Sequence, residues 1–153
     1  YLTFLPSSFM KIVFLKRFLN SKNLKDILIS YLKFKPEIYS ALTWINFPSK
    51  EKHYTSRVHR DYDDFKFLII VILWADVTKQ NGPTLYYTMS HTKNVSVPKK
   101  KLLTGKAGSV YIIDGYGLHS STAVKKGIRI SSWIRFGRKI NAASIQDGLT
   151  TCP

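Results

Sequence analysis

From residue 57 to residue 136 the sequence is a succession of short apolar segments separated by turn-forming residues, which leaves little room for helices. Segments rich in β-branched and aromatic residues predict strands. These predicted strands are residues 57–61, 66–75, 84–89, 108–114 and 128–136. Residues 79–83, which end in Asn81-Gly82-Pro83, predict a turn, Gly115 and Gly117 mark a bend, and the lysine-rich residues 91–104 predict a loop. Many short strands with frequent turns favour a β-sandwich or jelly roll.

Residues 1–35 have a different pattern, with apolar residues recurring near the helical period of 3.6. A first amphipathic helix is predicted up to Leu19, and Ser21 is a candidate cap for a second helix that Pro36 ends. Residues 38–47 are again aromatic and branched and predict a strand, which a polar loop follows. Helices followed by strands predict an α+β protein that is mainly β, with the sandwich or jelly roll at its centre.

The length of 153 residues suits a single domain, residues 1–153, with one sizeable core. We expect a helical N-terminal segment, residues 1–45, and a strand-rich core, residues 46–140. No composition shift marks a boundary between them. The first residue is Tyr1, so the chain is compatible with being part of a longer protein.

The net charge of +15 invites comparison with nucleic-acid-binding proteins. However, 18 of the 24 basic residues are lysines and only 6 are arginines, whereas phosphate and base recognition favours the planar guanidinium group. Abundant Lys, Ile, Asn, Tyr and Phe also occur together in proteins from AT-rich genes. We therefore expect nucleic acid not to be the partner, and an anionic substrate or acidic partner stays open.

The cysteine count and the hydropathy pattern bear on the compartment. Cys152 is the only cysteine, so neither an internal disulfide nor a cysteine-based zinc cluster can form. The longest apolar run, residues 67–75, is far shorter than the roughly 20 residues of a membrane-spanning helix. These features predict a cytoplasmic protein without a transmembrane segment. The sequence does not indicate the oligomeric state.

Three residues could together hold a metal ion. His59-Arg60-Asp61 lies in a predicted strand, where alternation places His59 and Asp61 on one face. His119 follows a later strand and a glycine bend, 60 residues further along the chain. Two imidazoles and one carboxylate on one face of an octahedral metal leave three positions open, which suits Fe(II). The alternative is that all three are ordinary polar residues of a β protein.

Arg129 lies ten residues after His119 in the last predicted strand, and Ser131 shares its face. A guanidinium can form a bidentate pair with a carboxylate, and a hydroxyl adds a hydrogen bond. The two residues could thus hold one end of a dicarboxylic cosubstrate whose 2-oxo acid end chelates the metal. The alternative is that Arg129 pairs with Asp76 or Asp114.

Other polar residues are assigned less specific roles. Arg135 and Arg138 are expected to be surface charges, and Asp63 and Asp64 are expected to be solvated or to cap a loop. His91 is either a contact near the site or a solvent-facing loop residue. His53 is expected to lie in a loop.

The motif order His59-x-Asp61, Asn81-Gly82-Pro83, Ser90-His91, His119 and Arg129-x-Ser131 resembles the phytanoyl-CoA dioxygenase family over about residues 55–137. Met89 stands where that family usually has glycine. The resemblance implies a double-stranded β-helix, a cupin-like jelly roll. It also implies an Fe(II)- and 2-oxoglutarate-dependent dioxygenase that consumes O₂, forms succinate and hydroxylates a small-molecule or carrier-bound substrate. The implied metal ligands are His59, Asp61 and His119, and the implied cosubstrate contacts are Arg129 and Ser131.

Two other functions stay open. A nucleic-acid oxidative demethylase uses the same chemistry and carries further arginines after the distal histidine, and Arg135 lies six residues beyond Arg129. The turn and Ser-His motifs fit the phytanoyl-CoA dioxygenase family better. A non-catalytic jelly roll that binds a metal or a ligand is the third possibility.

Overall fold

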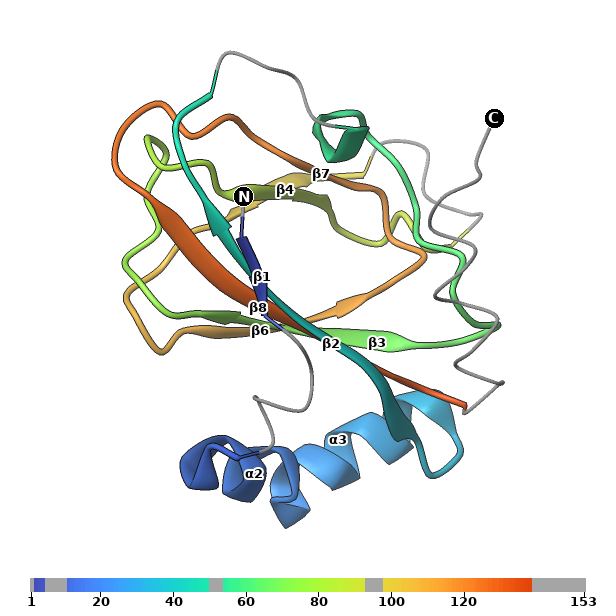
Figure 1. Ribbon diagram of the computed structural model, residues 1–153. Helices are drawn as coiled ribbons and strands as arrows, with labels where there is room; N and C mark the ends of the chain where they lie inside the picture. Colours follow the sequence, from blue (N-terminus) through green and yellow to red (C-terminus); the bar gives the residue numbers. More distant parts are fainter. Residues whose placement is uncertain (1, 5–10, 50–53, 93–97, 139–153) are drawn as a thin grey trace.

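The computed structural model describes residues 2–4, 11–49, 54–92 and 98–138 (Figure 1). In chain order the elements are β1 (Leu2–Phe4), α2 (Val13–Leu19), α3 (Lys22–Leu32), β2 (Glu37–Asn46), the 3₁₀ turn η1 (Tyr54–Ser56), β3 (Leu68–Leu73), β4 (Thr84–Tyr87), β5 (Lys100–Leu103), β6 (Val110–Asp114), β7 (His119–Ser121) and β8 (Arg129–Gly137).

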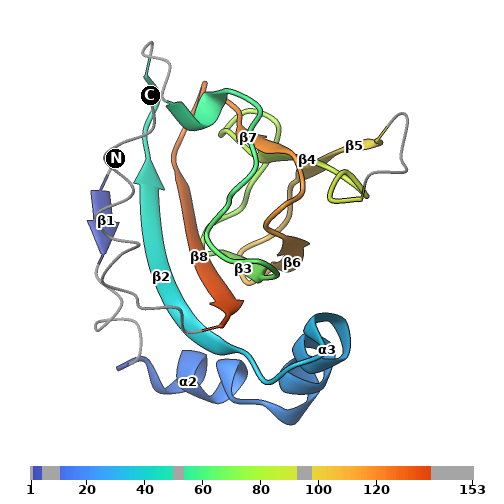
Figure 2. The same ribbon diagram turned by 90° about the vertical axis from the view of Figure 1, so that its right-hand side faces the viewer.

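The strands form two antiparallel sheets that lie opposite one another (Figure 2). The five-stranded sheet has the order β1-β2-β8-β3-β6, and the three-stranded sheet has the order β5-β4-β7. The segment around His59 joins the smaller sheet through a single antiparallel bridge to His119 in β7. The chain is therefore mainly β with two helices near its N-terminus, as the sequence predicted.

Strand β3 is the centre of the core, and all six of its residues are buried. Its alternate side chains Leu68, Ile70 and Ile72 pack with the leucines of α2 and α3 on the outer face of the large sheet. The intervening side chains, Ile69, Val71 and Leu73, face the smaller sheet. A strand covered on both faces has no polar side, which is why residues 66–75 form an almost continuous apolar run.

Three sequence predictions about strands need correction. Residues Leu2–Phe4 form β1 rather than a helix, because they pair with the edge of β2 at Thr43–Ile45. Lys100–Leu103 is a strand and not part of a loop, because it pairs with β4. The predicted strand 57–61 is reduced to the one bridge at His59. In each case the deciding partner is a segment distant in sequence.

Both helices lie within the segment that the sequence predicted to be helical, but α2 begins only at Val13. Ser21 is the residue that precedes α3, but its side chain makes no capping hydrogen bond. The helix ends at Leu32 with Lys33 in a left-handed conformation (φ 66°), before Pro36 is reached. Within the described part of the chain, neither helix has the length and apolar character needed to cross a membrane.

Candidate metal centre

The structure brings together the three side chains that the sequence singled out as metal ligands. One ligand atom from each of His59, Asp61 and His119 lies within 4.8 Å of the others. The Nε2 atoms of His59 and His119 are each 3.7 Å from Oδ1 of Asp61. The two imidazole ring centroids are 4.4 Å apart. This spacing suits three atoms that share one cation.

Backbone hydrogen bonds hold the three residues in place. The amide of His59 donates to the carbonyl of His119 (2.9 Å), and the amide of His119 donates to the carbonyl of His59 (3.0 Å). The amide of Asp61 donates to the carbonyl of Gly115 (3.1 Å). His59 and Asp61 therefore keep the alternation of an extended chain, although the full strand does not form.

The tautomer of each histidine follows from its neighbours. Nδ1 of His59 is 2.8 Å from the carbonyl oxygen of Arg57, and Nδ1 of His119 is 2.9 Å from that of Gly117. A carbonyl oxygen can only accept a hydrogen bond, so each ring donates from Nδ1 and turns its Nε2 toward Asp61. Burial lowers the pKa of His119, although Asp61 opposes this effect. A neutral imidazole with a bare Nε2 is the form that binds a metal.

Arg135 is a residue of this site that sequence reasoning missed. It was expected on the surface, but its Nη2 lies 3.0 Å from Oδ2 of Asp61 and its Nε lies 2.7 Å from Oδ2 of Asp63. Desolvation lowers the pKa of Arg135, but the two carboxylates outweigh it and the net pKa is raised. Alternation along β8 from Ser131 could have revealed that Arg135 faces inward.

Arg135 leaves the other oxygen of Asp61 available. It binds Oδ2, whereas Oδ1 points toward both histidines. Asp63 was expected to be solvated or to cap a loop, but it is half-buried and pairs with Arg135. Burial raises the pKa of Asp63, and Arg135 opposes this effect. The arginine thus orients Asp61 and neutralises two neighbouring carboxylates.

We expect Arg135→Gln to destabilise the protein by about 3–5 kcal/mol, because it leaves two largely buried carboxylates without a counter-charge. The free energy of unfolding in urea at neutral pH measures this loss. Arg138→Gln is the matched control, since Arg138 is exposed on the same strand end. Equal stability of the two variants would show that the Arg135 ion pairs contribute nothing.

Arg129 is a buried cation whose hydrogen-bond partners are all neutral. Its Nη1 donates to the carbonyl of Gly82, and its Nη2 (3.0 Å) and Nε (3.2 Å) donate to Oδ1 of Asn46. Burial lowers its pKa to about 10. The two proposed acidic partners are engaged elsewhere, since Asp76 pairs with Lys106 (2.8 Å) and Asp114 accepts the hydroxyl of Tyr31 (2.5 Å).

No described carboxylate therefore pairs with Arg129, and a buried charge of this kind is costly unless an anion accompanies it. Ser131 is buried on the same face of β8, opposite Leu73 of β3. The face of β8 that carries Arg129 and Ser131 continues to Trp133, whose ring centroid is 5.6 Å from that of His119. Arg129 and the metal-ligand set therefore lie on the same side of the large sheet, the side that faces the smaller sheet.

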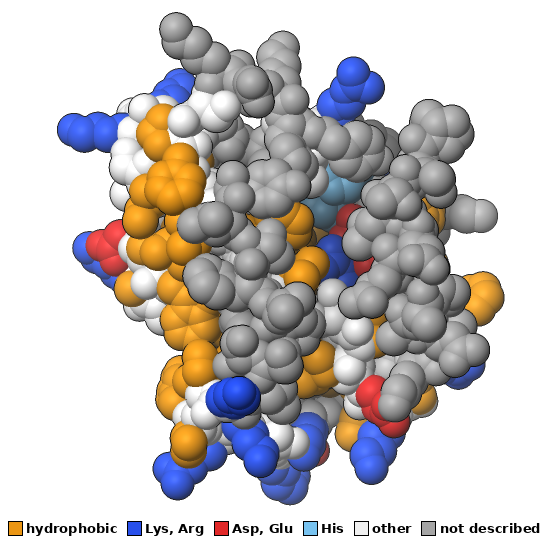
Figure 3. Space-filling model, in the orientation of Figure 1, with side chains coloured by type: hydrophobic (Ala, Val, Ile, Leu, Met, Phe, Trp, Pro, Cys, Tyr) orange, Lys and Arg blue, Asp and Glu red, His pale blue; other side chains and the backbone are white. Residues whose placement is uncertain are grey.

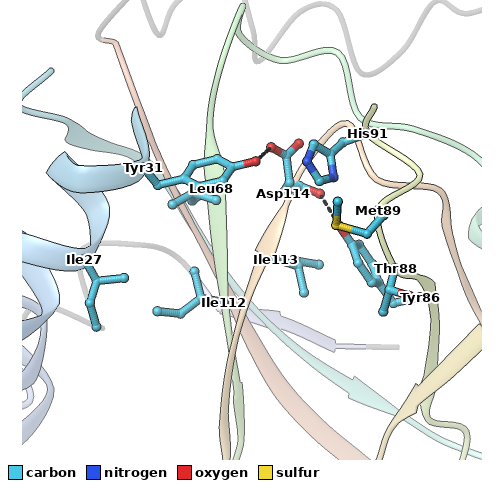
Figure 4. Close-up of a pocket in the computed structure, with 10 residues that line it drawn as sticks. All are labelled: Ile27, Tyr31, Leu68, Tyr86, Thr88, Met89, His91, Ile112, Ile113 and Asp114. Carbon is cyan, nitrogen blue, oxygen red and sulfur yellow. Dashed lines mark hydrogen bonds between the residues drawn. The ribbon is translucent and has the colours of Figure 1, made fainter. Parts of the chain in front are cut away.

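The remaining polar residues take structural positions. Asp64 is buried and accepts hydrogen bonds from the amides of Phe65 (2.6 Å) and Arg138 (2.5 Å), so it caps its loop. His91 lines a separate cavity of about 240 Å³ together with Tyr31 and Asp114 (Figure 4). His53 lies outside the described residues.

The turn predicted at residues 79–83 and the backbone at Met89 also have structural explanations. The side chain of Asn81 binds the backbone amide of Thr78 and the carbonyls of Asp76 and Ile128, which anchors the predicted turn. Gly82 has a φ of 77°. Met89 has a φ of 63°, a conformation that glycine adopts more readily.

His59 and Asp61 keep part of their side chains exposed, with fractions of 16% and 15%. In Figure 3, histidine, acidic and basic side chains are visible together at the floor of a hollow in one face of the molecule. The hollow lies on the side of the large sheet away from α2 and α3, because those helices pack on its outer face.

No family model and no curated protein matches the sequence. Several solved structures do match the fold. SnoN, a non-heme alpha ketoglutarate dependent epimerase from nogalamycin biosynthesis, has a TM-score of 0.68 and 14% identity over 88% of this chain and 60% of its own. EctD from S. alaskensis with bound Fe has a TM-score of 0.67 and 19% identity over 86% and 55%. EvdMO1 has a TM-score of 0.62 and 16% identity over 80% and 32%.

The TM-scores of 0.62 to 0.68 establish a common fold. The chain spans between about a third and about three fifths of the length of these three structures.

Proposed function

We propose that the chain is the catalytic core of a non-haem Fe(II)- and 2-oxoglutarate-dependent dioxygenase that hydroxylates a small-molecule or carrier-bound substrate. The observation that carries this proposal is the convergence of two Nε2 atoms on Oδ1 of Asp61, while each Nδ1 is held by a backbone carbonyl. A surface cluster of polar residues would not need its nitrogen and oxygen atoms to converge in this way.

The donor set fits iron. Two neutral imidazoles and one carboxylate bind non-haem Fe(II) and leave positions for a chelating cosubstrate and O₂. Bound iron would supply the activation of O₂ and of the 2-oxo acid. His59, Asp61 and His119 would hold the ion, and Arg135 would keep Asp61 in place. Proteins of this fold support the choice, since EctD is known with bound Fe and SnoN with Fe³⁺ and alpha ketoglutarate.

Arg129 is the proposed anchor for the far carboxylate of 2-oxoglutarate. It lies in the same interior as the metal ligands and no described carboxylate neutralises it. Ser131, two residues along the same face, would add a hydroxyl contact. One structure of EctD contains 2-oxoglutarate, which supports a cosubstrate of this class in the shared fold.

The strand order supports a double-stranded β-helix of the kind found in the phytanoyl-CoA dioxygenase family. In β2-β8-β3-β6 and in β5-β4-β7, neighbours come alternately from the first and second half of the strand sequence, as expected for two interlocked Greek keys, whereas β1 adds to the edge of β2. The Asn81 turn and the left-handed conformation of Met89, at a position where that family usually has glycine, support the resemblance.

The proposal is tested by incubating the protein with Fe(II), 2-oxoglutarate and O₂ and measuring succinate by mass spectrometry. We expect slow succinate formation that a suitable substrate accelerates. A pool of small metabolites and a methylated oligonucleotide should be compared as accelerators. Absence of succinate under all conditions, with iron shown to bind, would favour a non-catalytic jelly roll.

A nucleic-acid demethylase of the same chemistry is a second candidate. The observation that favours it is Arg135, which lies six residues after Arg129 and reaches the site through Asp61. Acceleration by the methylated oligonucleotide alone would select this candidate over the small-molecule hydroxylase.

The presence of Asp61 at the metal centre predicts which type of product the reaction forms. In related halogenases a small residue replaces this carboxylate and leaves room for chloride. Here Asp61 occupies the position and Arg135 holds it there, so we expect an alcohol or its further oxidation product. Turnover of an accelerating substrate in chloride-rich buffer under ¹⁸O₂ should place labelled oxygen in the product, with some exchange with water. A chlorinated product would overturn both the ligand assignment and the reaction class.

A further inference from the structure

Helices α2 and α3 concentrate positive charge that is scattered along the sequence. Residues 11–35 contain seven basic residues and one acidic residue, a net charge of +6. All seven basic side chains are exposed. They are Lys11, Lys16, Arg17, Lys22, Lys25, Lys33 and Lys35. In Figure 3 basic side chains gather along the lower edge of the molecule, where Figure 1 places the two helices.

Large apolar side chains of α2 are exposed among these charges. The exposed fraction is 63% for Val13 and 68% for Phe14, whereas Leu15 and Leu19 are buried against the sheet. Val13 and Phe14 lie four and three residues before Arg17, so the three side chains are neighbours on the outward side of the helix. Solvent is an unfavourable environment for a phenylalanine in this position.

Helix α3 has a similar outward side. Lys22, Lys25, Ile29 and Lys33 follow one another at intervals of three and four residues and are all exposed. Such spacing places them in one row along the helix. Leu24, Leu28 and Leu32 form a separate, buried row. Each helix thus presents leucines to the protein core and a mixture of lysine and apolar side chains to the outside.

We propose that the exposed sides of α2 and α3, here called the basic helical face, bind an anionic membrane surface. Helices that lie in a bilayer interface combine apolar side chains, which enter the acyl boundary, with lysines that contact acidic headgroups. Charge complementarity therefore favours acidic lipid over neutral lipid. Nucleic acid also attracts lysines, but its phosphate backbone offers no apolar surface on which the exposed aliphatic side chains of Val13 and Ile29 could be buried.

The position of this face agrees with the proposal. The helices cover the outer side of the large sheet, through Ile70 and Ile134 among others, whereas Arg135 and the metal-ligand set lie on its inner side. A protein attached through the basic helical face would keep the metal centre accessible. Membrane binding does not depend on the proposed oxygenase activity, so either proposal can be disproved while the other holds.

The test is co-sedimentation of the full chain with phosphatidylcholine vesicles that contain or lack phosphatidylserine. We expect binding only with phosphatidylserine, weakened by added salt. Lys16→Gln/Lys25→Gln should lower the partition coefficient about thirtyfold, because each basic residue near an anionic surface contributes about 1 kcal/mol. Val13→Ser/Phe14→Ser should lower it about tenfold or more through lost apolar burial.

Lys125→Gln/Lys126→Gln is the matched control for charge, and Ile128→Ser is the control for an exposed apolar residue. All three of these residues are exposed and lie outside the helices. Circular dichroism checks that every variant is folded. The proposal is overturned if the wild type does not bind acidic vesicles, or if the control variants lose as much binding. It is also overturned if Val13→Ser/Phe14→Ser binds unchanged while a single-stranded DNA oligonucleotide displaces the vesicles, which would assign the charge to nucleic acid.

Discussion

His119→Ala is expected to reduce Fe(II) affinity by more than about a hundredfold and to remove turnover. Residues that merely support a metal ligand already contribute about 10–100-fold to affinity, and His119 is a proposed ligand itself. Its Nε2 is 3.7 Å from Asp61 and its ring orientation is set by the carbonyl of Gly117. His59→Ala should have a comparable effect, since His59 occupies the matching position.

Isothermal calorimetry of anaerobic Fe(II) binding, with 2-oxoglutarate present, measures this loss. His91→Ala is the control, because His91 is also partly buried but lines the separate cavity beside Tyr31. If His59→Ala and His119→Ala both bind iron as tightly as the wild type, the assignment of the three ligands is wrong.

Arg129→Ala should raise the concentration of 2-oxoglutarate needed for half-maximal turnover about a hundredfold while leaving Fe(II) binding nearly intact. The reason is the loss of a charge-assisted bidentate contact, which is typically a few kcal/mol. Arg129→Lys should recover only part of this effect, because an ammonium keeps the charge but not the planar fork.

The variant also removes the hydrogen bonds that Arg129 donates to the carbonyl of Gly82 and to Oδ1 of Asn46, so thermal unfolding should be recorded alongside the kinetics. Arg138→Ala serves as the control, because Arg138 is exposed and lies over the ring of Phe34. An unchanged 2-oxoglutarate dependence in a folded Arg129→Ala protein would place the cosubstrate anchor elsewhere.

Local sequence patterns predicted most of the secondary structure. The apolar run 66–75 has no polar face, and a strand buried on both sides is the simplest structure that accepts it. The leucine spacing of α3 identifies the helix and its buried side. Alternation likewise predicted that His59 and Asp61 share a side, because side chains alternate along any extended chain. These features depend on neighbouring residues alone.

Contacts between segments distant in sequence decided the strands and the buried charges that local patterns did not predict. The sequence alone did not identify Leu2–Phe4 and Lys100–Leu103 as strands, because each becomes a strand only by pairing with β2 or β4. Arg135 was taken for a surface charge because Asp61 and Asp63 lie more than 70 residues before it. The sequence by itself thus determined the strand-rich class and the candidate ligands. The tertiary structure alone decided which charges are buried together, because the energy of a charge depends on its surroundings in space.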